Sequence, residues 1–219
     1  MPTYRNGSKY QQEMFRAPNA GIFSYSGQHF STSSAIFMDG MFDSASSFDQ
    51  DIRGWDVSTV KSFGFMFSNA ARFNADLSEW NVGSGTNFVG MFWEARRFTS
   101  NLSGWQTSKA TDMFGMFLRA TAFSSDLSSW QVSRVMDMYA MFLGAELFDS
   151  DISSWDVSNV VDMEDMFWQA SLFRRNLCPW GSRVDAETIV GTMFEGTSCP
   201  VQSDPLLTRS PPGPFCFLC

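Results

Sequence analysis

The chain has 219 residues, a formal net charge of −8 and 44% hydrophobic residues, with Phe, Met and Trp present in 23, 14 and 8 copies. With 16% aromatic residues the sequence is not that of a disordered chain, and its acidity argues against nucleic acid as a partner. The single histidine, His29, excludes most zinc sites and most histidine-based catalysis. No apolar run approaches the ~20 residues of a membrane span, so direct membrane insertion is not expected.

Residues 1–34 are predicted to form a degenerate N-terminal cap on the repeats that follow. Ala20 and Phe23 keep the small and aromatic positions of the repeat, but the Met-Phe pair is missing. The first residues lack the apolar stretch of a signal peptide. Three alternatives follow: the mature chain begins here, the gene is truncated, or the protein remains inside the cell.

Residues 35–184 consist of six copies of one 25-residue unit. A Met-Phe pair, a small residue, a second Phe and a Trp each recur with that period. The pairs begin at Met41, Met66, Met91, Met116, Met141 and Met166, and the tryptophans are Trp55, Trp80, Trp105, Trp130, Trp155 and Trp180. Such a fixed period indicates a chain that stacks one unit on the next.

The residues within a unit predict its secondary structure. Met66, Phe67, Ala70 and Phe73 fall at i, i+1, i+4 and i+7, which is one face of a short helix, and residues 76–80 are the best candidate for a strand. The predicted fold is therefore α/β, a leucine-rich-repeat-like solenoid of about six 25-residue coils with short strands and short helical segments. Equivalent aromatic side chains would stack in columns, with coils ~4.8 Å apart.

The unit, read for example over residues 41–58, resembles the repeat of the BspA-like leucine-rich-repeat surface proteins. That family is abundant in mycoplasma and listerial lipoproteins, and the resemblance covers about residues 35–184. It implies a secreted or surface-displayed protein used for adhesion or recognition. It supplies no catalytic residues to carry over.

The C-terminal region is predicted to hold a cap at residues 185–200 and a Pro/Ser/Cys-rich tail, or the start of a further module, at 201–219. A disulfide between Cys178 and Cys199 would close the cap in an oxidising compartment, whereas buried free thiols are the alternative. The final segment, 216–219, admits a prenylation box, a metal or redox pair, or the beginning of a Cys-rich module, which is the preferred interpretation.

An acid or amide stands immediately before the Ile or Leu of each unit. Stacked carboxylates could hold calcium between coils, or each side chain could accept backbone N–H groups in an Asx turn. Asn in two copies favours the turn, so no metal or other cofactor is predicted. The row is Asp51, Asp76, Asn101, Asp126, Asp151 and Asn176. His29 lies apart from these rows, so a Ser-His-acid triad is not expected and the chain is predicted not to be an enzyme.

One variable row follows each Met-Phe pair and is the candidate binding site. On a helix this position would lie opposite the core, which predicts an exposed apolar stripe and hence a contact surface. The alternative is that the segment is no regular helix and the row tucks under the preceding loop. The row is Trp93, Leu118, Leu143 and Trp168, and Phe65, Phe114 and Tyr139 widen the same surface. Arg96-Arg97 is expected to be solvated.

These features predict a non-catalytic recognition or adhesion module, located outside the cell or on its surface, although no signal peptide is visible in this chain. It would bind a protein or glycan partner through an extended face of the solenoid. The alternative is a structural spacer within a larger surface or matrix protein.

Overall fold

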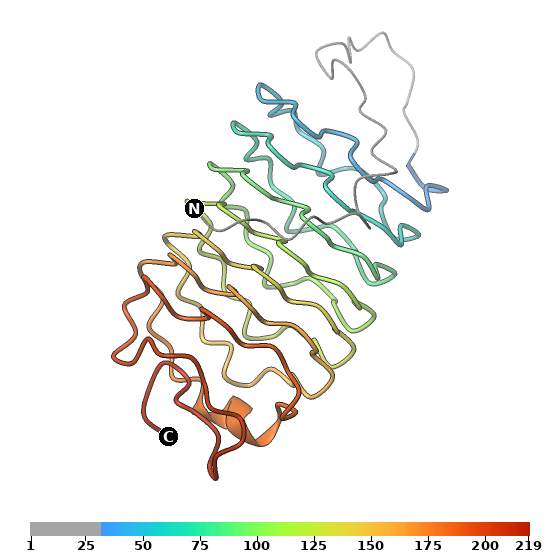
Figure 1. Ribbon diagram of the computed structural model, residues 1–219. Helices are drawn as coiled ribbons and strands as arrows, with labels where there is room; N and C mark the ends of the chain where they lie inside the picture. Colours follow the sequence, from blue (N-terminus) through green and yellow to red (C-terminus); the bar gives the residue numbers. More distant parts are fainter. Residues whose placement is uncertain (1–31) are drawn as a thin grey trace, which may run out of the picture.

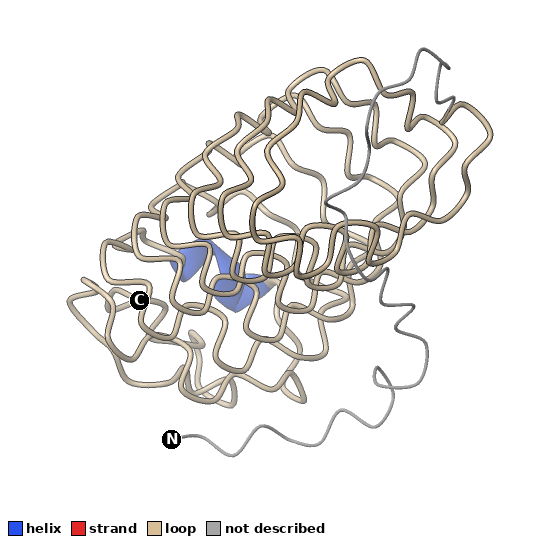
Figure 2. Ribbon diagram, turned by 90° about the horizontal axis from the view of Figure 1, so that it is seen from above, coloured by secondary structure: helices blue, strands red, loops and turns tan. Residues whose placement is uncertain are grey.

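The computed structural model describes residues 32–219, which form one elongated stack of coils (Figure 1). Viewed from above, successive coils follow the same path and lie on one another (Figure 2). Neighbouring coils are joined by isolated parallel β-bridges 25 residues apart, from Phe37 with Ser62 to Asp137 with Asp162, and then by Asp162 with Ile189. The described residues contain one helix, the 3-10 helix η1 (Cys178–Ser182). None of their helices is long and apolar enough to cross a membrane.

The predicted α/β class is wrong. Over residues 32–219 the bridges do not extend into strands or a sheet, and no coil contains a helical segment before η1. The segment that contains Met66 and Phe67 is a series of tight turns, because Phe65 and Asn69 both adopt a left-handed φ of 54°. A right-handed helix cannot continue through such residues. Residues 76–80, predicted as a strand, also form a turn, in which the Trp80 N–H bonds to the Leu77 carbonyl at 3.1 Å.

Backbone hydrogen bonds alternate along each turn series between two kinds of partner. Every second N–H donates to a carbonyl in the next coil, and the N–H between donates to the carbonyl three residues earlier. The bonds between coils run from Phe63, Phe65, Phe67 and Asn69 to Asn87, Val89, Met91 and Trp93, and the local ones from Met66, Ser68 and Ala70 to Phe63, Phe65 and Phe67. The backbone is satisfied without a helix or a sheet, and the coils are held together by main-chain bonds.

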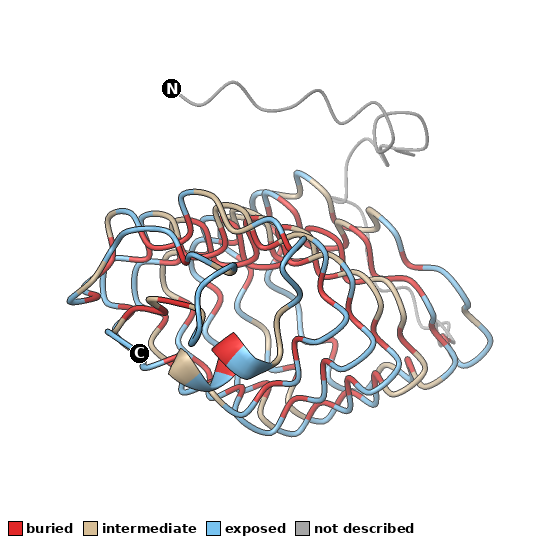
Figure 3. Cartoon of the chain, turned by 60° about the horizontal axis from the view of Figure 1, so that its bottom comes forward, coloured by how far each residue is buried: buried red, intermediate tan, exposed pale blue. Residues whose placement is uncertain are grey.

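Two columns of Phe rings form the centre of the core. Within one coil Phe117 and Phe123 stack with centroids 3.9 Å apart, and Phe117 stacks on Phe142 of the next coil at 5.6 Å. The predicted stacking of equivalent aromatic side chains is thereby confirmed, and the column continues from Phe42 to Phe194. Figure 3 shows how buried and exposed residues alternate around each coil.

The tryptophans add a hydrogen bond to this packing. The Trp105 indole N–H donates to the Leu77 carbonyl of the preceding coil at 3.0 Å, and its ring stacks on Trp130 at 6.2 Å. A buried Trp needs a partner for its N–H, and here that partner is the coil before it. The same bond is made by Trp80, Trp130, Trp155 and Trp180.

A buried serine row joins the coils at a third place, and sequence reasoning did not find it. The Oγ atoms of Ser100, Ser125 and Ser150 accept the N–H groups of Leu77, Leu102 and Leu127 in the preceding coils, at 2.8, 2.9 and 2.9 Å. These serines are 8–9% exposed. Since an unpaired buried N–H is costly, each hydroxyl is needed where it lies.

Residues 201–219 fold back onto the last coil, which differs from the predicted tail. Phe215 and Cys216 are fully buried in the main core, and the Leu177 N–H donates to the Phe215 carbonyl at 3.2 Å. The predicted Cys178–Cys199 disulfide does not form. The bonded pairs are instead Cys178 with Cys219 and Cys199 with Cys216, because the returning chain brings the last two cysteines to the cap. Most of the predicted N-terminal cap, residues 1–31, lies outside the described residues.

The serine row gives a first prediction. Replacing Ser125 by Ala leaves the Leu102 N–H buried without its acceptor and is expected to lower the free energy of unfolding by about 1–3 kcal/mol. Ser124→Ala, which removes the hydroxyl of the exposed neighbouring residue, is the control and should stay within about 0.5 kcal/mol. Urea unfolding measures both, and equal stabilities of the two variants would contradict the role given to Ser125.

The disulfides give a second prediction. The bond from Cys178 to Cys219 closes a sequence separation of 41 residues. In the chain-entropy account such a loop is worth about 4 kcal/mol. Cys178→Ala/Cys219→Ala is therefore expected to speed amide hydrogen exchange in residues 201–219 while residues 63–167 keep their protection. Unchanged exchange in 201–219 would contradict this role of the Cys178–Cys219 bond and would show that the Cys199–Cys216 disulfide and the packing of Phe215 hold the segment.

Candidate functional site

The predicted binding row lies in a second apolar cluster on the outside of the stack. Leu118 and Leu143 are only 1% and 4% exposed, whereas Trp93 and Trp168 are half-buried. The expectation of an exposed stripe is thus wrong at its centre. Because the segment is not a helix, the side chains of the row do not point directly away from the core. The Trp93 ring lies along the stack and reaches the next coil, where a Cβ added to Gly115 would be 3.6 Å from it.

An aromatic strip that includes Trp93 of this row runs across several coils, and its other members are Phe65, Phe114 and Tyr139. The ring centroids of neighbours along it are 6.2, 6.5 and 5.2 Å apart. Gly90 makes room for it, since a Cβ there would lie 2.5 Å from the Phe65 ring, and Gly90 also adopts a φ of +55°. The structure therefore brings together the aromatic residues that the sequence placed near the row.

Tyr139 ends the strip with its hydroxyl group on an acidic residue. The hydroxyl donates to Asp165 Oδ2 at 3.3 Å. Burial, and then the charge of Asp165, raise the pKa of Tyr139 to about 12. The phenol is accordingly neutral at physiological pH and serves as a hydrogen-bond donor.

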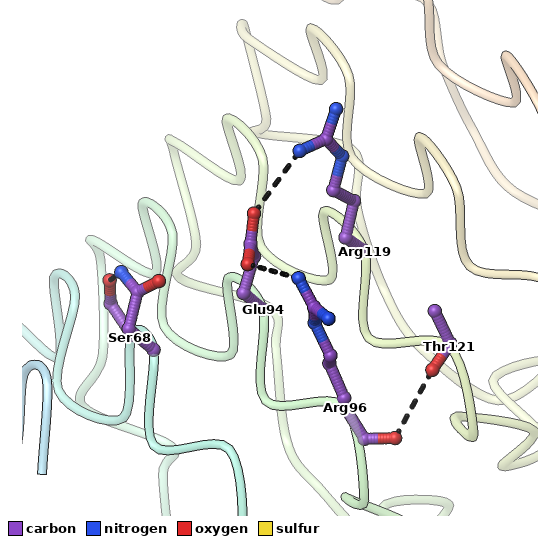
Figure 4. Close-up of polar contacts among 6 residues, drawn as sticks. Ser68, Glu94, Arg96, Arg119 and Thr121 are labelled. Atoms are coloured by element: carbon purple, nitrogen blue, oxygen red, sulfur yellow. Dashed lines mark hydrogen bonds and ion pairs between the residues drawn. The ribbon is translucent and has the colours of Figure 1, made fainter. Parts of the chain in front are cut away.

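An ion-pair cluster that spans two coils begins at Glu94, the residue after Trp93 (Figure 4). Glu94 Oε2 is 2.8 Å from an Arg96 nitrogen, and Glu94 Oε1 is 3.2 Å from Arg119 in the next coil. Partial burial acts to raise the pKa of Glu94, but the hydrogen bonds and charges of the two arginines outweigh it, so that the pKa is lowered. Glu94 and Arg119 both adopt a left-handed backbone conformation, with φ of 55° and 54°.

A hollow of about 690 Å³ opens between this cluster and the end of the row. Trp168, Leu143 and Gly144 supply its apolar surface, and Arg96 and Arg119 lie on its wall. Its volume is within the range of small-molecule sites. Two of the four predicted binding residues, Leu143 and Trp168, therefore line a concave site, and Leu118 and Trp93 lie beyond it along the row.

The remaining wall of the hollow is polar, with side chains from Thr121, Glu146, Gln169 and Ser171. Sequence reasoning missed all of these, as well as Arg119, and treated Arg96 as solvated. The available signal was the period itself: Arg119 follows Glu94 by one repeat, so that opposite charges at equivalent positions stack.

Two residues of the Asp/Asn row, Asp126 and Asp151, line a different hollow of about 640 Å³. Asp126 Oδ1 accepts the Ser128 N–H at 2.9 Å, and this bond holds the pKa of Asp126 below its usual range. Equivalent bonds occur at Asp51, Asp76, Asn101, Asp151 and Asn176, which confirms the Asx-turn interpretation.

The sequence also raised two other kinds of site, a metal site and a Ser-His-acid triad. No group of three or more His, Cys, Asp or Glu side chains within residues 32–219 could hold a metal ion. His29, the residue considered for a triad, lies outside the described residues.

The fold and the outer row define a repeat protein built of stacked coils. The family described as "Mycoplasma protein of unknown function, DUF285" matches residues 11–126 and 101–204, and the chain belongs to this family. The match is consistent with the resemblance to BspA-like repeats. No curated protein matches the chain.

The Asx turns give a third prediction. A carboxylate whose pKa is lowered by folding stabilises the folded state above its unfolded pKa of about 3.9, and that stability is lost as the pH falls through the folded pKa. Asp126→Asn keeps an acceptor for the Ser128 N–H, so at pH 7 it should change the unfolding free energy by less than about 0.5 kcal/mol, whereas Asp126→Ala should cost about 1 kcal/mol.

Acid titration of the same variants completes this test. Between pH 4 and 2 the stability of Asp126→Asn should fall less than that of the unchanged protein, because one titrating group is missing. Identical acid profiles of the two proteins in urea unfolding would contradict the assigned hydrogen bond.

Proposed function

We propose that the protein is a non-catalytic recognition or adhesion module, which binds a protein or glycan partner through the aromatic strip, the outer row and the hollow beside Trp168. The observation that carries this proposal is the joint position of half-buried aromatic rings and a concave site on the outside of the stack. Most other aromatic side chains of the described coils are in the main core. Aromatic residues with an accessible edge are typical of contact surfaces.

The two disulfides support a location outside the reducing cytosol. Disulfides persist in secreted and surface proteins and are rare where thiols are kept reduced. Cys178–Cys219 and Cys199–Cys216 both lie in the C-terminal cap. Secretion or display at the cell surface is accordingly part of the proposal.

A structural spacer within a larger surface or matrix protein is the second candidate. Its support is the regular bonding between coils, by alternate amides of each turn series and by the core tryptophans from Trp80 to Trp180, which makes a stiff body of repeated units. A spacer needs no partner at the outer row. The two candidates therefore differ in whether saturable binding depends on that row.

A double variant separates them. The protein is first tested on an array of immobilised glycans and purified extracellular proteins, and the tightest saturable ligand is retained. Trp93→Ser/Trp168→Ser is expected to weaken that binding at least tenfold, because both rings are the accessible part of the row. The matched control is Leu147→Ser/Leu172→Ser, which removes two apolar side chains that are 47% and 52% exposed and lie off the row.

The control should retain affinity within twofold. Urea unfolding establishes that each variant is folded, and if the tryptophan variant is not, Arg119→Ala/Gln169→Ala tests the exposed wall of the hollow instead. Saturable binding that survives these changes would contradict the proposed surface. Absence of saturable binding on the whole array would favour the spacer.

A further inference from the structure

The hollow beside Trp168 has an apolar part that suits a flat ligand. The half-buried Trp168 packs against the cluster that contains Leu143, so that its ring is fixed from behind. Gly144, with a φ of +65°, adds no side chain, and the Arg119 stem lies across it, since a Cβ there would be 3.2 Å from Arg119 Cγ. A fixed indole ring at the edge of a concavity offers a surface on which an apolar ring face can lie.

The polar wall supplies donors and acceptors side by side. Arg96 and Arg119 each carry five N–H donors, of which the bonds to Glu94 use only part. The hydroxyls of Thr121 and Ser171 donate to the carbonyls of Arg96 and Glu146, both at 3.3 Å, which leaves their oxygen lone pairs as acceptors.

The charges at the hollow are largely balanced. Glu146 lies on its wall with Arg96 and Arg119, and Glu94, which does not line the hollow, is ion-paired with both arginines. An anion would compete with Glu94 for the guanidinium groups and would meet Glu146, and a cation would meet the two arginines. A neutral ligand with many hydroxyls, each of which donates and accepts, satisfies both kinds of group.

From this combination we infer that the hollow binds a neutral sugar ring of a glycan, with an apolar face of the ring against Trp168 and its hydroxyls on Arg96, Arg119, Glu146 and Gln169. The inference rests on the proposed recognition function and narrows its partner to a carbohydrate. A pyranose has an apolar face of C–H groups and a polar rim, which is the division that the hollow presents.

Solution binding of defined sugars tests this inference. The probes are the methyl glycosides of glucose, galactose, mannose and N-acetylglucosamine, their short oligosaccharides, and methyl glucuronide as the charged comparison. Titrations are followed by calorimetry and by the indole N–H resonance of Trp168. At least one neutral probe is expected to bind saturably and to shift that resonance, while the glucuronide binds at least fivefold more weakly.

The variants then locate the site. Trp168→Ala and Arg119→Ala should each weaken the neutral sugar at least fivefold. The matched control Arg97→Ala removes an exposed arginine next to Arg96 that does not line the hollow, and it should stay within twofold. If Trp168→Ala proves unstable in urea, Gln169→Ala, an exposed side chain on the wall, takes its place.

The following results would contradict the sugar inference. Tighter binding of the glucuronide would show an anion site, and sugar binding that ignores both variants would place it elsewhere. If an arrayed protein binds through Trp93 and Trp168 but no sugar does, the sugar inference fails and the proposed function stands. If neither a sugar nor an arrayed protein binds saturably, the sugar inference and the proposed recognition function both fail. Linear glucans and N-glycans on the array distinguish a polysaccharide from a glycoprotein as the source.

Discussion

The hydrogen bond from one coil to the next is the interaction on which the rest of the structure depends. In each turn series alternate N–H groups leave the coil and bond to carbonyls of the following one, as from Gly115 to Tyr139 and from Phe117 to Met141. This fixes the register at one repeat, so that identical residues lie above one another. A slip by one residue would bring every Phe against a different neighbour and unpair every buried serine.

The register explains why the composition is so rich in aromatic residues. A single coil has no interior, and it becomes buried only between its neighbours. Flat rings stack in columns along such an axis, and Trp adds a hydrogen bond to the preceding coil. The same register creates the outer surface: Phe65 lies over Gly90, and Arg119 reaches both Glu94 behind it and Gly144 ahead of it.

Much of this order could be predicted from the sequence, because the period of 25 residues is free of insertions over six units. The aromatic columns and the Asx turns followed from it. The turn structure of the coils did not, because no single residue type marks the left-handed positions. Phe65 shares one of them with Gly90 and Gly115, and Gly144 shares the other with Asn69, Glu94 and Arg119. Apolar spacing of i, i+4 and i+7 was therefore mistaken for a helix. The disulfide pairing depends on the chain folding back at Phe215, and the hollow depends on four neighbouring coils, so neither could be derived from one unit.

The bond between coils can be observed directly as a scalar coupling across the hydrogen bond in an NMR experiment on labelled protein. The structure predicts a coupling from the Phe117 amide nitrogen to the Met141 carbonyl carbon, and from Gly115 to Tyr139. A coupling from Phe117 to the carbonyl of Met113, four residues earlier, would instead show an α-helix. That result would contradict the stacked turns and, with them, the position of the outer row and its hollow.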